Sequence, residues 1–213
     1  MPRHTSGPDN DGTNACAFLC VQLAHQLHKV HEKSQGGDSN SIWLEVCDIA
    51  EKVIVGYPRL INPHRDIGRF YDVMEAYKIM RNCDFMIEKY EFYEAIVSAE
   101  HIFSEKARME LLSSLSAIIS KKEFCVGIYT CDPVIFVIGF MGNSIFILDT
   151  HSISEKVGGK AKGILKVFPY FEDEPDTCEG ICYWIWQRLV SVAVPNTACQ
   201  SLSIVQKISR VCG

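Results

Sequence analysis

The sequence predicts an α+β fold, in which a helical N-terminal half packs on a mostly antiparallel sheet from the C-terminal half. Two observations carry this prediction. Apolar residues recur at helical spacing up to about residue 120, whereas three short segments between residues 124 and 151 are rich in β-branched and aromatic residues. Gly142-Asn143, between the second and third of these segments, is typical of a two-residue hairpin turn.

The helical half follows a lead-in rich in turn-forming residues, and Asn14 is the expected N-cap of its first helix. A loop is expected at 34–41, and the second helix is expected to end before Gly56-Tyr57-Pro58. Aromatic and β-branched residues at 85–97 weaken the helical pattern there. The predicted helices are 15–33, 42–55, 66–82 and 88–120.

The second half contains the expected sheet and one further helix. We expect a single catalytic domain over 1–213, with 1–14 as a partly flexible lead-in, 15–120 as a mainly helical lobe and 121–213 as a mainly sheet lobe. The predicted strands are 124–131, 134–141, 144–151, 163–171 and 202–206, and the predicted helix is 176–192.

The composition excludes several classes of protein. A net charge of -5, with Lys121-Lys122 as the only short basic run, argues against a nucleic-acid partner. The first residues lack the apolar core of a signal peptide and no run is long enough to span a membrane, so we expect a cytoplasmic or nuclear protein. The ten cysteines are therefore expected to be reduced.

Cys16 follows a glycine-containing polar loop, at the point where the sequence becomes apolar and helical. The N-terminus of a helix stabilises a thiolate through the helix dipole and free backbone N–H groups. Cys16 therefore has the position of a thiol nucleophile. The alternative is that it fills a small gap in the core.

Asp149 and His151 close the third predicted strand. Side chains two residues apart on a strand point to the same side, so the carboxylate of Asp149 can hydrogen-bond to the imidazole of His151 and stabilise its cation. The alternative is a strand that runs into a polar turn with both side chains in solvent.

Together these motifs resemble the papain-fold deubiquitinases of herpesvirus large tegument proteins and their cellular tegument-like relatives. The resemblance lies in NACAFL near the N-terminus and in GIYTCDPVIFVIGFMGNSIFILDTHSIS, and it covers roughly residues 8–170. It implies a papain-like cysteine protease fold and a thiol-dependent isopeptidase that cleaves after the C-terminal glycine of ubiquitin. The expected partners are ubiquitin or polyubiquitin, bound by a monomer without cofactor or metal.

The resemblance also assigns roles to residues. It makes Cys16 the nucleophile, His151 the general base and acid, and Asp149 the group that orients His151. The family places a glutamine upstream of the cysteine in the oxyanion hole, but no glutamine precedes Cys16. Asn10 is the expected substitute, together with the Cys16 backbone N–H, and Asn14 is the second choice. The expected contacts with the basic ubiquitin tail are Asp132, Asn14, Glu172 and Asp173.

Two alternatives remain at this point. The segment from Asp11 to Cys16 faintly echoes the signature of ovarian-tumour-type isopeptidases, which would process ubiquitin or a ubiquitin-like modifier. The missing glutamine instead favours a catalytically dead ubiquitin-binding adaptor of the same fold.

The first helix also carries residues with no expected role in the site. His25, His28 and His31 are expected to form a solvated stripe on this helix, and Cys20 is expected to pack in the core.

Overall fold

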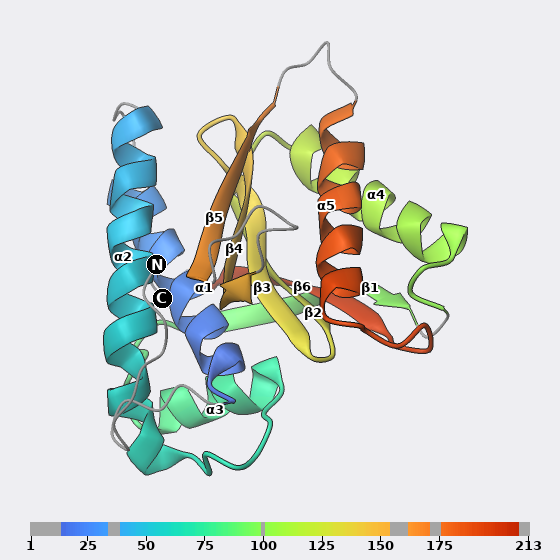
Figure 1. The fold of residues 1–213 in the computed structure, drawn as a ribbon. Helices are drawn as coiled ribbons and strands as arrows, with labels where there is room; N and C mark the ends of the chain where they lie inside the picture. Colours follow the sequence, from blue (N-terminus) through green and yellow to red (C-terminus); the bar gives the residue numbers. More distant parts are fainter. Residues whose placement is uncertain (1–13, 34–38, 99–100, 154–161, 171–175, 209–213) are drawn as a thin grey trace.

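The computed structural model describes residues 14–33, 39–98, 101–153, 162–170 and 176–208 (Figure 1). Helices dominate its first half and strands its second. The elements are α1 (Cys16–Lys33), α2 (Ser39–Ile61), the 3-10 helix η2 (Asn62–His64), α3 (Val73–Asn82), β1 (Tyr90–Ser98), α4 (Glu105–Ser120), β2 (Cys125–Cys131), β3 (Val134–Met141), β4 (Ser144–Ile153), β5 (Lys162–Pro169), α5 (Asp176–Ser191) and β6 (Gln200–Lys207).

The strands form one six-stranded sheet in the order β1-β6-β2-β3-β4-β5, and every neighbouring pair is antiparallel. The predicted hairpin between β3 and β4 is confirmed. Gly142 and Asn143 both have positive φ, 57° and 59°, as a two-residue turn of type I′ requires. The α+β fold class predicted from the sequence is therefore confirmed.

Helices cover both faces of the sheet, with α1, α2 and α3 on one side and α4 and α5 on the other (Figure 1). Each face of the sheet packs against its own hydrophobic core, and alternate residues of β4 point into one core or the other. Phe146 and Leu148 pack toward α1, whereas Ile145 and Ile147 pack toward α4 and α5. By the same alternation, Asp149 belongs to the α5 side.

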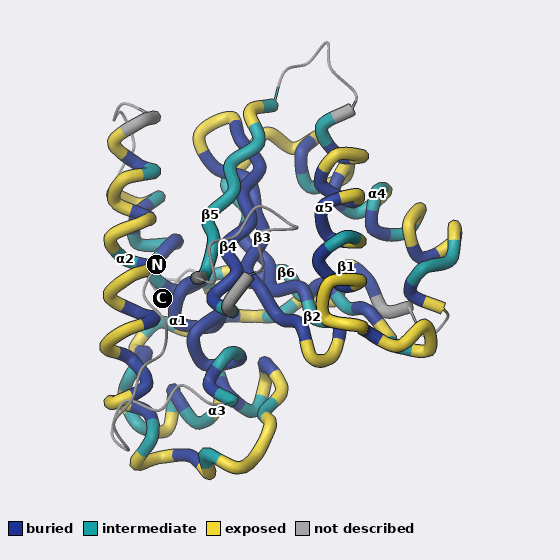
Figure 2. The backbone as a smooth tube through the Cα atoms, in the orientation of Figure 1, coloured by how far each residue is buried: buried dark blue, intermediate teal, exposed yellow. Residues whose placement is uncertain are grey.

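Helix α1 is enclosed by its neighbours. It contacts α2 and α3 on one side and β2, β3 and β4 on the other. Figure 2 shows most of its length as buried, and burial extends to the polar Gln22 and to His25. Residues 16–24 of this helix are apolar except for Gln22, as is typical of a helix segment in a core. Cys16 therefore lies at the N-terminus of a helix whose first half is enclosed by the core.

The predicted helix over 88–120 is wrong in its first part, which forms strand β1. Tyr90 is buried while Glu91 is exposed, and β1 pairs along its length with β6. Tyrosine, phenylalanine and β-branched residues favour this half-buried position, although glutamates intervene. The helix begins only after Ser104, whose hydroxyl accepts a hydrogen bond from Ala107 N at 3.2 Å.

Two other predicted helices have different bounds. Helix α2 runs through Pro58 to Ile61, beyond the expected end at residue 55, and it begins at Ser39 within the expected loop. Burial of Tyr57 and Ile61 explains why the last turn is helical despite the proline. The helix expected over 66–82 begins at Val73, after a capping box formed by Asp72 and Glu75.

The sheet also draws on both predicted lobes, because β1 comes from within residues 15–120. Helix α4 packs on the opposite face of the sheet from the other three helices of that half. The division into lobes stays a prediction. No helix of the described residues is long and apolar enough to cross a membrane.

Candidate active site

Cys16 is the first residue of α1, and its neighbour Ala15 precedes the helix. The Ala15 carbonyl accepts a hydrogen bond from Leu19 N at 3.0 Å, which closes the first turn. Backbone amides at the start of a helix have no partners within the helix, so they can bind an anion beside Cys16. Cys16 is partly exposed, whereas Cys20 one turn later is buried. Burial raises the pKa of the Cys20 thiol well above its ordinary value.

Asn14 differs from its expected role as N-cap. Its Nδ2 donates a hydrogen bond to the Ile67 carbonyl at 3.1 Å, and its φ of 55° lies in the left-handed region that asparagine tolerates. The side-chain amide thus ties the turn before Cys16 to the segment between η2 and α3. Tyr71 in that segment packs edge-on against Phe18 at 5.1 Å between ring centroids. Asn14 therefore positions the start of α1.

Asp149 and His151 lie at the end of β4, and the carboxylate of Asp149 accepts two hydrogen bonds from His151 on Oδ1. The backbone N of His151 donates at 2.9 Å and Nδ1 donates at 2.7 Å. Asp149 is fully buried, while 28% of the His151 side chain is exposed. Because Nδ1 is occupied, Nε2 is the ring nitrogen left for Cys16.

A break in strand pairing places His151. The pairing of β4 with β3 ends at Leu148, and the register between β4 and β5 shifts between Asp149 and Ile153. In this irregular stretch the His151 N–H bonds to the Asp149 side chain instead of a neighbouring strand. A bulge of this kind re-aims a side chain. Here it allows an imidazole anchored on the α5 side to reach Cys16 on the α1 side.

The pKa of His151 reflects its hydrogen bond with Cys16. Burial disfavours the imidazolium, but hydrogen bonds to Asp149 and to Cys16 outweigh it and raise the pKa of His151 to about 10. Burial also opposes ionisation of Asp149. The hydrogen bonds and positive charges of His151 and Arg188 outweigh that effect, so the pKa of Asp149 lies below its ordinary value. The structure thus brings all three predicted triad residues together.

Among the described residues, Arg188 belongs to the site and is not predicted from the sequence. Its Nε donates to Oδ2 of Asp149 at 2.9 Å, and its side chain is only 3% exposed. A signal was present in the sequence. Arg188 follows Ile181, Trp184 and Ile185 at helical spacing, so α5 carries a permanent charge on its buried face.

The expected substrate contacts are only partly described. Asp132 is exposed in the turn between β2 and β3. That turn lies at the same end of the sheet as His151, because β3 runs antiparallel to β4 with Val137 opposite Leu148. The other predicted contacts Glu172 and Asp173, and the predicted oxyanion donor Asn10, lie outside the described residues.

Within the described residues, the cavity found in the structure is separate from the candidate triad. No group of three or more His, Cys, Asp or Glu side chains in the described part of the chain is arranged to hold a metal ion. A cavity of about 690 Å³ lies between α4 and α5, on the face of the sheet opposite α1. Its lining includes Phe103, Trp186 and Leu189, but no candidate triad residue.

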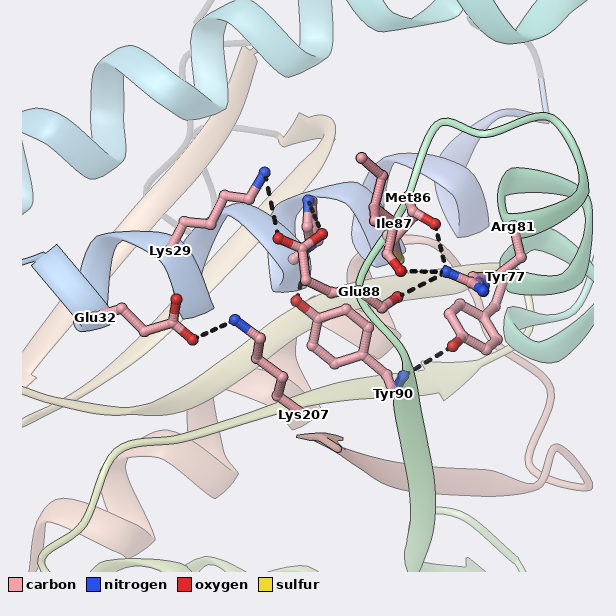
Figure 3. Close-up of polar contacts among 10 residues, drawn as sticks. Lys29, Glu32, Tyr77, Arg81, Met86, Ile87, Glu88, Tyr90 and Lys207 are labelled. Atoms are coloured by element: carbon pink, nitrogen blue, oxygen red, sulfur yellow. Dashed lines mark hydrogen bonds and ion pairs between the residues drawn. The ribbon is translucent and has the colours of Figure 1, made fainter. Parts of the chain in front are cut away.

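The predicted solvated stripe of histidines on α1 is wrong. His25 is buried and its Nδ1 lies 2.8 Å from the Tyr90 hydroxyl. His28 Nε2 donates to the Val205 carbonyl at 3.0 Å. The end of α1 packs against β1 and β6, which the sequence pattern did not place there. Figure 3 shows contacts of this region, including Lys29 with Glu88, Glu32 with Lys207, and Tyr90 N with the Tyr77 hydroxyl.

Comparisons with known proteins give structural neighbours only. No protein-family model matches the chain, and no curated protein sequence does. One neighbour is the ubiquitin-specific protease encoded by murine cytomegalovirus tegument protein M48, whose structure was solved with a ubiquitin-based suicide substrate. Its sequence identity to this chain is 10% and its TM-score is 0.49, and the match covers 97% of this chain and 83% of that chain. The Pseudomonas avirulence protein AvrPphB is 10% identical with a TM-score of 0.43, covering 95% of this chain and 96% of that chain.

Proposed function

We propose that the protein is a cysteine protease in which Cys16 is the nucleophile, His151 the general base and acid, and Asp149 the residue that orients His151. One observation carries this proposal. A partly exposed thiol on the first turn of a helix hydrogen-bonds an imidazole whose other nitrogen is held by a buried carboxylate. This chain of contacts is the arrangement by which a thiol is activated for acyl transfer.

The proposed reaction begins from an ion pair, in which Nε2 of His151 already holds the proton of the Cys16 thiol. The sulfur attacks the substrate carbonyl, and the imidazolium then gives its proton to the departing amine as the carbon–nitrogen bond breaks. Water, deprotonated by His151, attacks the thioester and releases a carboxylate and the free thiol. The raised pKa of His151, about 10, keeps the imidazole protonated at neutral pH, ready to protonate the leaving group.

We further propose that the substrate is the C-terminal tail of ubiquitin, which is basic and ends in two glycines. The sequence resemblance described above supports this substrate. The exposed carboxylate of Asp132 at the same end of the sheet as His151 also supports it, because it can attract an arginine of the tail. Glu172 and Asp173 are proposed to contribute in the same way.

A ubiquitin probe with a C-terminal electrophile tests this function. The wild-type protein should form a covalent adduct that is stable in denaturing gels, and Cys16→Ala should form none. Cys47→Ala and Cys199→Ala are matched controls, because both thiols are exposed and would react in a non-specific labelling. Labelling that persists in Cys16→Ala, or that is lost in a control, would contradict the assignment.

The alternative of a ubiquitin-binding adaptor has one observation in its favour. The amide of Asn14 is engaged by Ile67, which weakens its case as oxyanion donor. If Asn10 provides the second donor, Asn10→Ala should lower kcat by on the order of 100-fold or more. Tight ubiquitin binding by the wild type without probe labelling would instead favour the adaptor.

A further inference from the structure

The carboxylate of Asp149 is held at both oxygens. Oδ1 receives the two hydrogen bonds of His151, while Oδ2 receives Nε of Arg188 at 2.9 Å. The Arg188 side chain is fixed in turn, because Nη1 donates to Ser191 Oγ at 3.4 Å and that hydroxyl donates to the Arg188 carbonyl at 2.7 Å. The last turn of α5 therefore sets the position of one carboxylate oxygen.

We propose that Arg188 is a positioning residue, which holds the Asp149 carboxylate in the orientation that receives Nδ1–H of His151. It does so from α5, on the far side of the sheet from the helix that carries Cys16. The inference rests on the proposed function, since Arg188 acts on the reaction only through Asp149 and His151.

Burial makes this second partner necessary. Asp149 is fully buried and the Arg188 side chain is 3% exposed, so water is a poor substitute for either partner. A buried carboxylate with one free oxygen can rotate about its terminal bond or take up a proton, and a protonated Asp149 no longer stabilises the imidazolium. Arginine remains charged at any ordinary pH and donates in a fixed planar geometry, so it prevents both changes.

The other ionisable groups near Asp149 cannot replace Arg188 as its permanent positive partner. Cys16 and Cys20 are the thiols nearby, and a thiol carries no positive charge in either protonation state, so neither can stabilise the Asp149 carboxylate as Arg188 does. Arg188 and the His151 imidazolium are the positive charges that lower the pKa of Asp149. When His151 is neutral, Arg188 is the remaining cation of this set.

Arg188→Gln tests the proposal, with Arg108→Gln as the matched control. Arg108 is also an arginine paired with a carboxylate, Glu105, but both are largely exposed on α4. In Arg188→Gln we expect kcat on ubiquitin-derived substrate to fall by on the order of 100-fold, because the triad is misplaced, while KM changes by less than about threefold. Arg108→Gln should leave both constants unchanged. Wild-type kcat in Arg188→Gln would overturn the proposal.

A double-mutant cycle separates positioning from general destabilisation. If Arg188 acts through Asp149, adding Arg188→Gln to Asp149→Asn should cause no further loss of kcat. Losses that multiply would show that Arg188 acts independently and would overturn the proposal. The double variant replaces an ion pair by two neutral amides, so it should fold even if Arg188→Gln alone does not. Arg188→Lys, which keeps the charge, should lose less kcat than Arg188→Gln.

A spectroscopic readout does not depend on the enzymatic assignment. In protein with ¹⁵N-labelled histidine, the Nδ1–H resonance of His151 should be sharp in the wild type and in Arg108→Gln. It should broaden through exchange with water in Arg188→Gln. If the wild type fails to hydrolyse ubiquitin conjugates but this resonance still responds, the proposed function fails and the positioning role stands. An unchanged resonance in folded Arg188→Gln contradicts the positioning role itself.

Discussion

His25 and His151 are two buried or half-buried histidines whose Nδ1 atoms make hydrogen bonds of similar length, yet the two protonate at opposite ends of the pH range. The bond from His25 to the Tyr90 hydroxyl is 2.8 Å, and the bond from His151 to Asp149 is 2.7 Å. Burial and the charge of Lys29 lower the pKa of His25 to about 4. The contacts with Asp149 and Cys16 raise the pKa of His151 to about 10.

The pKa values of His25 and His151 differ because their hydrogen-bond partners, a hydroxyl and a carboxylate, differ in charge. Burial raises the pKa of Tyr90, so its hydroxyl remains neutral and does not stabilise an imidazolium. The carboxylate near His25 belongs to Glu88, which is 3.6 Å away and itself approached by Lys29. Hydrogen-bond length therefore does not reveal the function of a buried histidine, whereas the charge of its partner does. Four changes break or sharpen this comparison.

His151→Gln is expected to have the largest effect. Glutamine can mimic the position of Nε2 but cannot carry a proton between the thiol and the leaving group. Hydrolysis of a fluorogenic ubiquitin substrate should fall by at least on the order of 10⁴-fold. His25→Asn, which can keep a contact with Tyr90, should leave kcat unchanged; a comparable loss of kcat in this variant would mean that the two histidines do not differ in function.

Asp149→Ala should have a smaller effect on turnover, on the order of 100- to 1000-fold, because positioning of the imidazole suffers while the thiol and imidazole remain. The pKa of His151 should fall, since its anionic partner is gone. Steady-state kinetics against pH measure both effects. Asp48→Ala, which removes an exposed partner of Lys52, serves as control. Full activity in Asp149→Ala would remove Asp149 from the triad.

The two histidines should also give stability opposite pH dependences. The depressed pKa of His25 means that the folded state binds fewer protons, so stability rises with pH between about 4 and 6.5. At about 1.4 kcal/mol per unit of pKa, this contribution is about 3 kcal/mol. The raised pKa of His151 gives stability that is complete below 6.5 and is lost as pH rises toward about 10.

Urea denaturation at a series of pH values measures both limbs of this profile. His25→Asn should flatten the acid limb and leave the alkaline limb in place, whereas His151→Gln should do the reverse. An acid limb that is unchanged in His25→Asn would show that other groups cause the acid sensitivity.

Tyr90→Phe should have the smallest effect. It removes the hydroxyl that contacts His25 and leaves that ring nitrogen without its partner, at a cost of about 1–3 kcal/mol in the free energy of unfolding. Turnover should not change, because Tyr90 contacts His25, and His25 is no part of the proposed triad. Thermal unfolding and kinetics on one preparation test this pair of outcomes.

The local parts of the site could be predicted from the sequence, and the parts that depend on distant segments could not. Cys16 at a helix start and the Asp149-x-His151 spacing are short-range patterns, and the structure brings these residues together. The site roles themselves stay a proposal. Arg188 was missed because its partner Asp149 is 39 residues away, and only the packing of α5 on the sheet joins them.

The same reason explains the errors in the fold. Strand β1 pairs with β6, and Tyr90 lies opposite Lys207 more than a hundred residues later, so no local pattern contains that pairing. Because the local pattern over 90–98 predicts a helix, a buried environment for His25 is not expected from the sequence. The extension of α2 through Pro58 likewise reflects tertiary burial of Tyr57 and Ile61, which overrides local helix propensity.

The enclosure of α1 has a consequence for how the protein loses activity. Cys16 is carried by α1, and because α1 packs against two helices and three strands, a local opening of the surface does not unfold it. Backbone amides in the middle of α1 should therefore exchange with deuterated water only as fast as the whole molecule unfolds. Heating should abolish catalysis and unfold the core in one transition. Residual activity would then measure the fraction of folded protein.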